Sequence, residues 1–242
     1  MKGVPSPFTP FTESRCPDWL CPICTNQTLR IKQGSFHYGV RSLQESRRRQ
    51  IQLPEVDESY VFSCLLECFR EGCAGTVAVS GEGWTEIHFP FRPDGLYTYQ
   101  LFRARSFTPP LPLFLLPVGC PEKISRQLNV ISSLLTLDGA AAANAIRCLL
   151  EILMDVMGAP EAKNLHRRIH QVLNKFGADA AAIHALKALG NAGSHGNEIT
   201  SSDLEEACLV LESVVKKFCH SAPDISKIVE RLEAAFSVRK QQ

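Results

Sequence analysis

The sequence has no uninterrupted apolar run of about eighteen residues, the length that a helix needs to cross a bilayer. Its most apolar stretches are 111–119, which is short and follows two prolines, and 140–157, which carries three charged residues. Residues 1–15 are rich in Pro, Ser and Thr where a secretory signal needs an apolar core. The sequence therefore predicts no membrane partner, and it predicts a cytoplasmic protein.

An excess of charge of either sign is also missing. The chain has 26 Lys and Arg against 25 Asp and Glu, and residues 1–110 hold 12 of the first kind and 11 of the second. Because the electrostatic affinity for nucleic acid depends on how many phosphates are contacted, any contact with RNA must come from a local patch. With 45% hydrophobic and 21% charged residues, the composition is that of a globular protein.

Three catalytic signatures are missing as well. The sequence has no Ser-His-Asp set, no glycine-rich phosphate loop and no HExxH helix. Hydrolase, nucleoside triphosphatase and metalloprotease functions therefore have no support.

The front part of the chain is typical of β structure. Its segments are short, rich in β-branched and aromatic residues, and separated by Gly-Glu-Gly and Arg-Pro-Asp-Gly turn signals. We expect an extended arm at 1–18 and a β-rich domain at 19–107. The polar segment 42–52 contains Arg47, Arg48 and Arg49, which would suit phosphate contacts in a loop or a short helix. The expected strands are 28–32, 60–65, 76–80, 84–90 and 97–107.

The sequence from residue 108 onward predicts a connector followed by helices. Residues 108–120 hold several prolines and are expected to form a stiff connector without a helix. Apolar residues at helical spacing then predict a bundle over 121–242, in which Arg147 and Glu151 can pair. Ser201 or Ser202 ahead of two glutamates resembles a capping box. The expected helices begin at 121 and continue with 141–157, 164–176, 179–189, 202–219 and 224–236.

Two cysteine pairs have the spacing of metal-binding turns. Cys21-Pro-Ile-Cys24 and Cys68-Phe-Arg-Glu-Gly-Cys73 are separated by predicted strands. Four thiolates suit a tetrahedral zinc ion, and a site with four protein ligands leaves no open position for catalysis. A structural zinc ion would therefore cross-link a small sheet.

Other interpretations of these cysteines stay open. They can be half-buried thiols in a sheet, or other residues can replace some of them as ligands. A redox Cys-x-x-Cys has little support because no βαβ pattern surrounds it. The possible substitute ligands are Cys16, Cys64, His37 and His88.

The segment 187–196 is the most suggestive polar cluster of the chain. It places Lys187, Asn191 and His195 among small residues that let another chain approach closely. These side chains can alternatively cap a helix end in a glycine-rich turn, or bind a nucleotide or nucleic acid without hydrolysis. His166, Arg167, Arg168 and His170 lie on one predicted helix, as a solvated face or an RNA-binding stripe.

From about 117 to 218 the sequence resembles the bacterial family known as domain of unknown function 4145, a helical branch of the HEPN superfamily. The resemblance rests on the proline-rich lead-in, AAANAIRCLLEIL at 141–153, residues 165–177, the Gly-Asn-x-x-x-His element at 190–195 and the Ser-Asp-Leu-Glu helix. The cysteine-containing front end also looks like the N-terminal region of many members.

The resemblance implies a dimer that cleaves RNA without a metal ion. Carried over, His195 is the acid/base residue, Asn191 the polar residue of the motif, and Lys187 stands where family members usually have arginine. A histidine that titrates near neutrality can take the proton of a ribose 2′-hydroxyl, and a nearby cation can stabilise charge on the phosphate. Lysine cannot grip phosphate bidentately, and its gap to His195 is longer than in established nucleases of the superfamily.

The sequence thus predicts an α+β protein with a β-rich, zinc-ribbon-like domain followed by an all-α HEPN-like bundle. Two functions stay open. One is a homodimeric, RNA-associated protein, a metal-independent ribonuclease of bacterial defence or toxin type. The other is a non-catalytic docking module for a protein partner, with a structural zinc ion.

Overall fold

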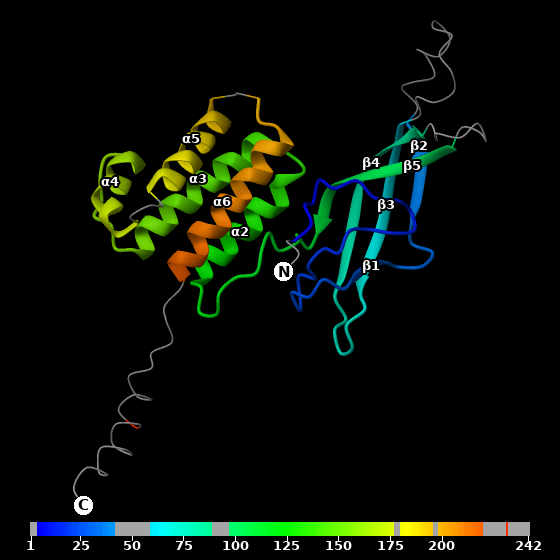
Figure 1. Cartoon of the computed structure of the whole chain (residues 1–242), viewed down its shortest axis with the longest axis horizontal. Coiled ribbons are helices and arrows are strands. Elements are labelled where there is room, and N and C mark those ends of the chain that lie inside the picture. Colours follow the sequence, from blue (N-terminus) through cyan, green and yellow to red (C-terminus); the bar gives the residue numbers. More distant parts are fainter. Residues whose placement is uncertain are drawn as a thin grey trace, which may run out of the picture.

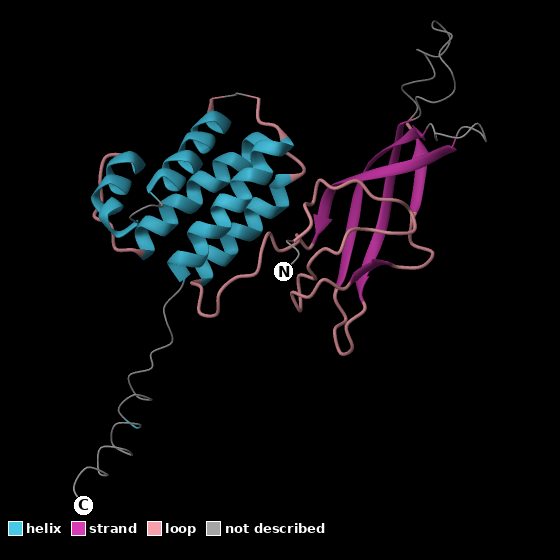
Figure 2. Cartoon of the chain, in the orientation of Figure 1, coloured by secondary structure: helices cyan, strands magenta, loops and turns pink. Residues whose placement is uncertain are grey.

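The computed structural model describes residues 4–41, 59–88, 97–176, 180–195, 198–219 and 231. An antiparallel sheet comes first along the chain and a set of packed helices follows (Figures 1 and 2). This order confirms the predicted α+β class. We refer to residues 4–108 as the sheet half and to residues 122–219 as the helical half.

The sheet has five strands, all paired antiparallel. β3 is central: β4 pairs with one side of it, the short strands β1 and β2 share its other side, and β5 follows β4. Four of the five strands are where the sequence predicts strands, whereas β2 was not predicted. The strands are β1 (Leu29–Ile31), β2 (His37–Val40), β3 (Ser59–Cys68), β4 (Thr76–His88) and β5 (Tyr97–Thr108).

The predicted break within 76–90 is wrong. Gly-Glu-Gly at 81–83 lies inside β4, next to a register shift between Ser80 and Gly81. A Cβ on Gly81 would come within 2.1 Å of the Arg103 carbonyl oxygen. The glycines therefore allow two strands to approach closely at an irregular point of the ladder, and they do not form a turn.

One face of the sheet carries an aromatic core. Along β3, buried residues such as Phe62 alternate with exposed ones, as expected for a strand that is covered on one side. The N-terminal arm lies against this core. Phe11 exchanges backbone hydrogen bonds of 2.8 and 2.9 Å with Phe102 and is only 3% exposed, and Cys16 is 4% exposed. The segment expected to be an extended arm thus supplies core residues.

The proline-rich connector joins the two halves without a helix, as predicted. Leu111 packs into the core of the sheet half, and Phe114 packs into the core of the helical half. The Thr136 hydroxyl, at the end of the first helix, donates a 2.9 Å hydrogen bond to the carbonyl oxygen of Arg105 in β5. The two halves are therefore attached by packing and by hydrogen bonds.

Five helices form the helical half within the described residues. Their buried side chains recur at helical spacing, for example Ile124, Leu128 and Ile131, and form one aliphatic core. The helix predicted to end at 189 continues to Ser194, and the helix predicted at 224–236 lies outside the described residues except for Arg231. The helices are α2 (Glu122–Leu135), α3 (Gly139–Val156), α4 (Leu165–Phe176), α5 (Ala180–Ser194) and α6 (Ser201–Cys219).

The N-terminus of α6 has a different cap from the one predicted. Thr200 and Asp203 form the reciprocal pair: the Asp203 backbone N–H donates to Thr200 Oγ1 at 3.2 Å, and the Thr200 backbone N–H donates to Asp203 Oδ2 at 2.8 Å. Ser201 and Ser202 are therefore the first residues of the helix and not its cap.

None of the described helices combines the length and the apolar character that a membrane span requires.

Candidate metal centre and polar helix face

The four predicted cysteine ligands come together at one end of the sheet. Cys21 and Cys24 lie in the turn before β1, while Cys68 ends β3 and Cys73 lies in the loop that leads to β4. Their sulfur atoms all lie within 4.8 Å of one another. Cys21 Sγ is 3.9 Å from Cys73 Sγ, and Cys24 Sγ is 3.6 Å from Cys68 Sγ. A tetrahedral ion with bonds of about 2.3 Å separates its sulfurs by about 3.8 Å, so the cluster can bind a metal ion.

Local backbone geometry makes both turns possible. Thr25 has a φ of 56° and Gly72 a φ of 76°, so each turn contains a left-handed residue. A Cβ on Gly75 would lie 2.7 Å from Cys21 Sγ, which leaves room for no side chain there. The Cys68 backbone N–H donates to the Gly75 carbonyl at 2.8 Å and closes the second turn. The glycines of this motif thus allow the sulfurs to converge.

The cluster suits a cation electrostatically. A hydrogen bond with the Asn26 backbone, with smaller contributions from neighbouring groups, lowers the pKa of Cys24 to about 6, whereas burial raises the pKa of Cys21. Four thiolates at this separation repel one another, and a divalent cation removes that repulsion and favours the deprotonated sulfurs. Thr28 Oγ1 lies 3.0 Å from Cys68 Sγ and can donate to it from outside the cluster.

The possible substitute ligands lie elsewhere. Cys16 and Cys64 are buried in the aromatic core of the sheet half, and Cys16 Sγ points at the Leu29 carbonyl oxygen at 3.7 Å. His37 lies on β2, and the side chain of His88 is outside the described residues. The described cluster therefore contains the four cysteines of the two turns and no other candidate.

Lys187, Asn191 and His195 lie along one side of α5 and its C-terminal end. Each is four residues from the next, and the His195 backbone N–H donates to the Asn191 carbonyl at 3.1 Å. Eight helical residues span about 12 Å, so Lys187 and His195 are not brought together within one chain. The described residues offer the Asn191 and His195 side chains no hydrogen-bond partner, so no cap formed by these side chains is seen.

The glycines of this segment pack helices and do not make a bend. Gly190 and Gly193 lie inside α5 and face α3. A Cβ on Gly190 would lie 2.5 Å from Arg147 Cβ, and one on Gly193 would lie 2.6 Å from the Ala140 carbonyl oxygen. The expectation of a glycine-rich turn is therefore wrong: these residues bring α5 close to α3 and so fix the direction of the polar face.

A histidine cluster adjoins this polar face. Lys187 Nζ lies 3.4 Å from Nδ1 of His166, and the rings of His170 and His184 lie beside His166. The charge of Lys187 is the main cause that lowers the pKa of His166. Sequence reasoning singled out His166 and His170 but missed His184. The sequence signal that could have identified His184 is its position three residues before Lys187, which places both side chains on the same face of a helix.

The structure shows ion pairs in two of the charged groups that the sequence singled out. The Arg147–Glu151 pair is present at 3.4 Å, as predicted. On α4, Arg168 Nη2 lies 2.6 Å from Asp155 Oδ1, so this arginine ties α4 to α3. The predicted arginine loop, Arg47–Arg49, lies outside the described residues.

The chain thus has a sheet half with a four-cysteine cluster and a helical half with a polar face on α5. Two family models match it, with boundaries close to those of the two halves. Residues 9–109 match a Domain of unknown function (DUF8608), and residues 129–235 match a Domain of unknown function (DUF4145). The second match agrees with the resemblance seen in the sequence. No curated protein and no solved structure matches the chain.

Proposed function

We propose that the chain is an RNA-associated protein of HEPN-like type, in which a zinc-ribbon-like sheet half supports a helical half that cleaves RNA without a metal ion. The observation that carries the proposal is the face of α5: an ammonium group, an amide and an imidazole at spacings of four residues. Among the described residues no carboxylate pairs with Lys187. Its charge is therefore available to a phosphate.

The zinc ion in this proposal is structural. Cysteine side chains can fill all four positions of a tetrahedral ion, so no position stays open for substrate. The bound ion would join the turn before β1 to the β3–β4 loop, and it would do so in a sheet with two strands of only three and four residues. Zinc thus serves the fold of the sheet half, and chemistry belongs to the helical half.

The spacing on α5 favours a homodimer. Asn191 lies midway between Lys187 and His195. If two antiparallel α5 helices cross on a two-fold axis near Asn191, each Lys187 approaches His195 of the partner subunit, and two equivalent sites form. Ala188 and Ala192 flank this line and allow close contact. A dimer would therefore bring together Lys187 and His195, which lie about 12 Å apart along the helix of one chain.

The chemistry requires no cofactor. The neutral imidazole of His195 takes the proton of a ribose 2′-hydroxyl, whose oxygen attacks the adjacent phosphorus. The bond from phosphorus to the 5′-oxygen breaks, and this oxygen receives a proton from solvent or a second imidazole. Lys187 stabilises the charge on the phosphate oxygens, and Asn191 can hold one of them. The products are a 2′,3′-cyclic phosphate and a 5′-hydroxyl. This is the type of activity that such domains show in bacterial defence and toxin systems.

The test is incubation of zinc-loaded protein with mixed single-stranded RNA in buffer that contains no added metal ion and no chelator to remove the structural zinc, followed by analysis of the product ends. We expect cyclic or 3′-phosphate ends, and we expect His195→Ala to abolish them. Glu198→Gln, an exposed change nearby, is the matched control. Intact RNA together with the absence of salt-dependent binding at low salt would contradict the proposal.

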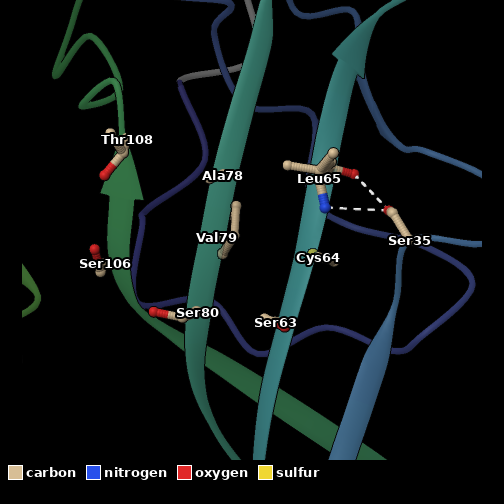
Figure 3. Close-up of a pocket in the computed structure, with 9 residues that line it drawn as sticks. All are labelled: Ser35, Ser63, Cys64, Leu65, Ala78, Val79, Ser80, Ser106 and Thr108. Carbon is tan, nitrogen blue, oxygen red and sulfur yellow. Dashed lines mark hydrogen bonds between the residues drawn. The ribbon is translucent and has the colours of Figure 1, made fainter.

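A docking role without catalysis is the second candidate, and the outer face of the sheet favours it. There a hollow of about 280 Å³ is lined mainly by small side chains. Figure 3 shows Ser63, Ser80 and Ser106 beside one another on β3, β4 and β5, where they are directly paired in register. Leu65 lies next to them and is 37% exposed. If RNA is neither bound nor cut, Ser80→Arg in this hollow should abolish capture of a protein partner.

A further inference from the structure

The histidine cluster of α4 and α5 is a second group of metal-ligating side chains, in the other half of the chain from the four cysteines. His166 and His170 are four residues apart and share one face of α4, and His184 on α5 faces both. The ring centroids of His166 and His170 are 4.7 Å apart, and each is 5.9 Å from the centroid of His184. Three imidazoles thus form a nearly regular triangle.

This triangle has the size of a three-histidine metal site. Three imidazoles that bind one tetrahedral ion through bonds of about 2.0–2.1 Å place their ring centres about 5 Å apart. Among the described residues only the cysteines have ligand atoms all within 4.8 Å of one another, so the histidine rings must turn to bring their nitrogens together. His166 and His170 are exposed, so a change between staggered rotamers is sterically open to them.

Lys187 affects this cluster in two opposite ways. Its ammonium lies 3.4 Å from Nδ1 of His166 and is the main cause that lowers the pKa of this ring, which favours the neutral form that metals bind. The same positive charge repels a metal cation. It would instead attract an anion such as phosphate. The effect of removing this charge therefore distinguishes a metal site from an anion site.

We propose that His166, His170 and His184 bind a divalent transition-metal ion, with water in the remaining position. Imidazole nitrogens are suitable ligands for zinc, nickel and copper, whereas magnesium and calcium prefer oxygen. The ion would clamp α4 onto α5. The ion takes no part in the proposed RNA chemistry, which needs no metal ion, although the two sites share Lys187, whose ammonium contacts His166.

The test is calorimetric titration of nickel into protein whose cysteine cluster has first been loaded with zinc. We expect one nickel ion per chain and a higher melting temperature, because the ion binds the folded state. His184→Gln and His170→Gln should each weaken nickel binding at least tenfold. His37→Gln, which changes an exposed histidine on β2, should leave it unchanged. Helical circular dichroism checks that each variant is folded.

The charge of Lys187 provides the decisive comparison. We expect Lys187→Gln to strengthen nickel binding, since it removes a repelling cation. The proposal is overturned if His184→Gln and His170→Gln both bind nickel like the unmodified chain, or if none binds. It is also overturned if Lys187→Gln weakens binding and inorganic phosphate binds in place of nickel, because the cluster is then an anion site.

A different pair of side chains supports a second, independent inference. Cys120 lies just before α2 and Cys219 is the last residue of α6, and their sulfur atoms are 2.7 Å apart, inside van der Waals contact. Cys120 is half-buried and Cys219 is buried. The two ends of the helical half thus meet at a pair of thiols that needs only a small movement to bond.

We infer that Cys120 and Cys219 are a reversible disulfide site, oxidised by a low-molecular-weight disulfide such as oxidised glutathione. The more accessible Cys120 thiolate attacks the glutathione disulfide, forms a mixed disulfide and releases one glutathione thiolate. The Cys219 thiolate then attacks Cys120 Sγ and releases the second. The two cysteines lose two protons and two electrons, and the glutathione disulfide is reduced. Burial raises the pKa of Cys219 to about 12, so only a small fraction of this thiol is ionised at neutral pH and its attack is slow.

Peptide mapping without reductant tests this site in zinc-loaded protein treated with oxidised glutathione. We expect one cross-link between the peptides of Cys120 and Cys219, and a higher urea midpoint that dithiothreitol reverses, because the bond constrains the unfolded chain. Cys219→Ser should abolish both effects, and Cys208→Ser on the same helix should retain them. A lasting glutathione adduct on Cys120, or no change at Cys120, would overturn the inference.

Discussion

The sheet half and the helical half reach stability in different ways. The sheet half gathers an aromatic core from distant segments, including Phe11, Trp19 and Phe102, and the four-cysteine cluster lies at one end of its sheet. The helical half has an aliphatic core whose members recur every three or four residues. The first therefore depends on long-range pairing, to which the proposed zinc ion would add a cross-link, and the second depends on local periodicity. Substitutions in each half should therefore separate these two modes of stabilisation.

The largest effect is expected from the cysteine cluster. Cys21→Ser should destabilise the zinc-loaded sheet half by several kcal/mol, since structural zinc contributes about 10–16 kcal/mol to the folding of small zinc peptides. Hydrogen exchange should show that β3 and β4 lose protection while α3 keeps it. Cys148→Ser, a change on α3, is the control. Equal loss of protection in both halves would mean that the halves are not separate in stability.

Close glycine packing is expected to matter in both halves. Gly81→Ala places a Cβ against the Arg103 carbonyl, and Gly190→Ala places one against Arg147. We expect each to cost about 1–3 kcal/mol by overpacking, with the larger loss at Gly81, where rigid backbone is met. Urea unfolding measures both. Gly39→Ala, with no atom within 4 Å of the new Cβ, is the control and should change little.

The contact between the halves should have an intermediate effect. Thr136 is 4% exposed, and its hydroxyl donates to the Arg105 carbonyl. Thr136→Val keeps the shape and removes this donor, which should cost about 1 kcal/mol because a partly buried hydrogen bond is lost. Calorimetry should then show the melting transitions of the two halves moving apart. An unchanged profile would show that this bond does not couple them.

The smallest effect is expected at the cap of α6. The side-chain hydrogen bond from Thr200 and then its backbone hydrogen bond lower the pKa of Asp203 below its usual 3.8. Because the folded pKa is the lower one, this stabilisation is complete above the ordinary pKa and is lost as the pH falls through the folded value. Asp203→Asn should therefore be less stable than the unmodified chain at pH 7, and the difference should shrink as the pH falls below 3.8. A difference that does not depend on pH would contradict this assignment.

Local patterns predicted much of the fold. All five described helices begin within two residues of their predicted starts, because buried apolar residues at helical spacing define them. The break within β4 was predicted wrongly, since glycines that allow strands to approach look like glycines that make a turn. The same ambiguity at Gly190 and Gly193 hid the C-terminal part of α5. In each case the decisive fact is a contact with another element, which the local sequence does not contain.

The candidate sites also differ in how far their residues could be predicted from local sequence. The cysteine ligands could be predicted because their spacing is fixed by turn geometry, and the structure brings all four together. Lys187 and His195 share a face of α5, but their separation along the helix became clear only when 190–194 proved to be helical. His184 was missed because its partners come from another helix. The spacing of residues in the sequence thus predicts site residues that share one turn better than it predicts site residues that come from two different helices.

Complementation of two inactive chains tests the central claim most directly. His195→Ala and Lys187→Ala proteins, both loaded with zinc, are assayed for RNA cleavage without added metal ions, alone and after mixing under conditions that exchange subunits. In a mixed dimer, one of the two shared sites regains both an intact His195 and the partner's intact Lys187. We predict that each variant alone is inactive and that the mixture recovers about a quarter of the unmodified activity by statistical pairing. A mixture that stays inactive while the unmodified chain cleaves RNA would contradict a site shared between two α5 helices.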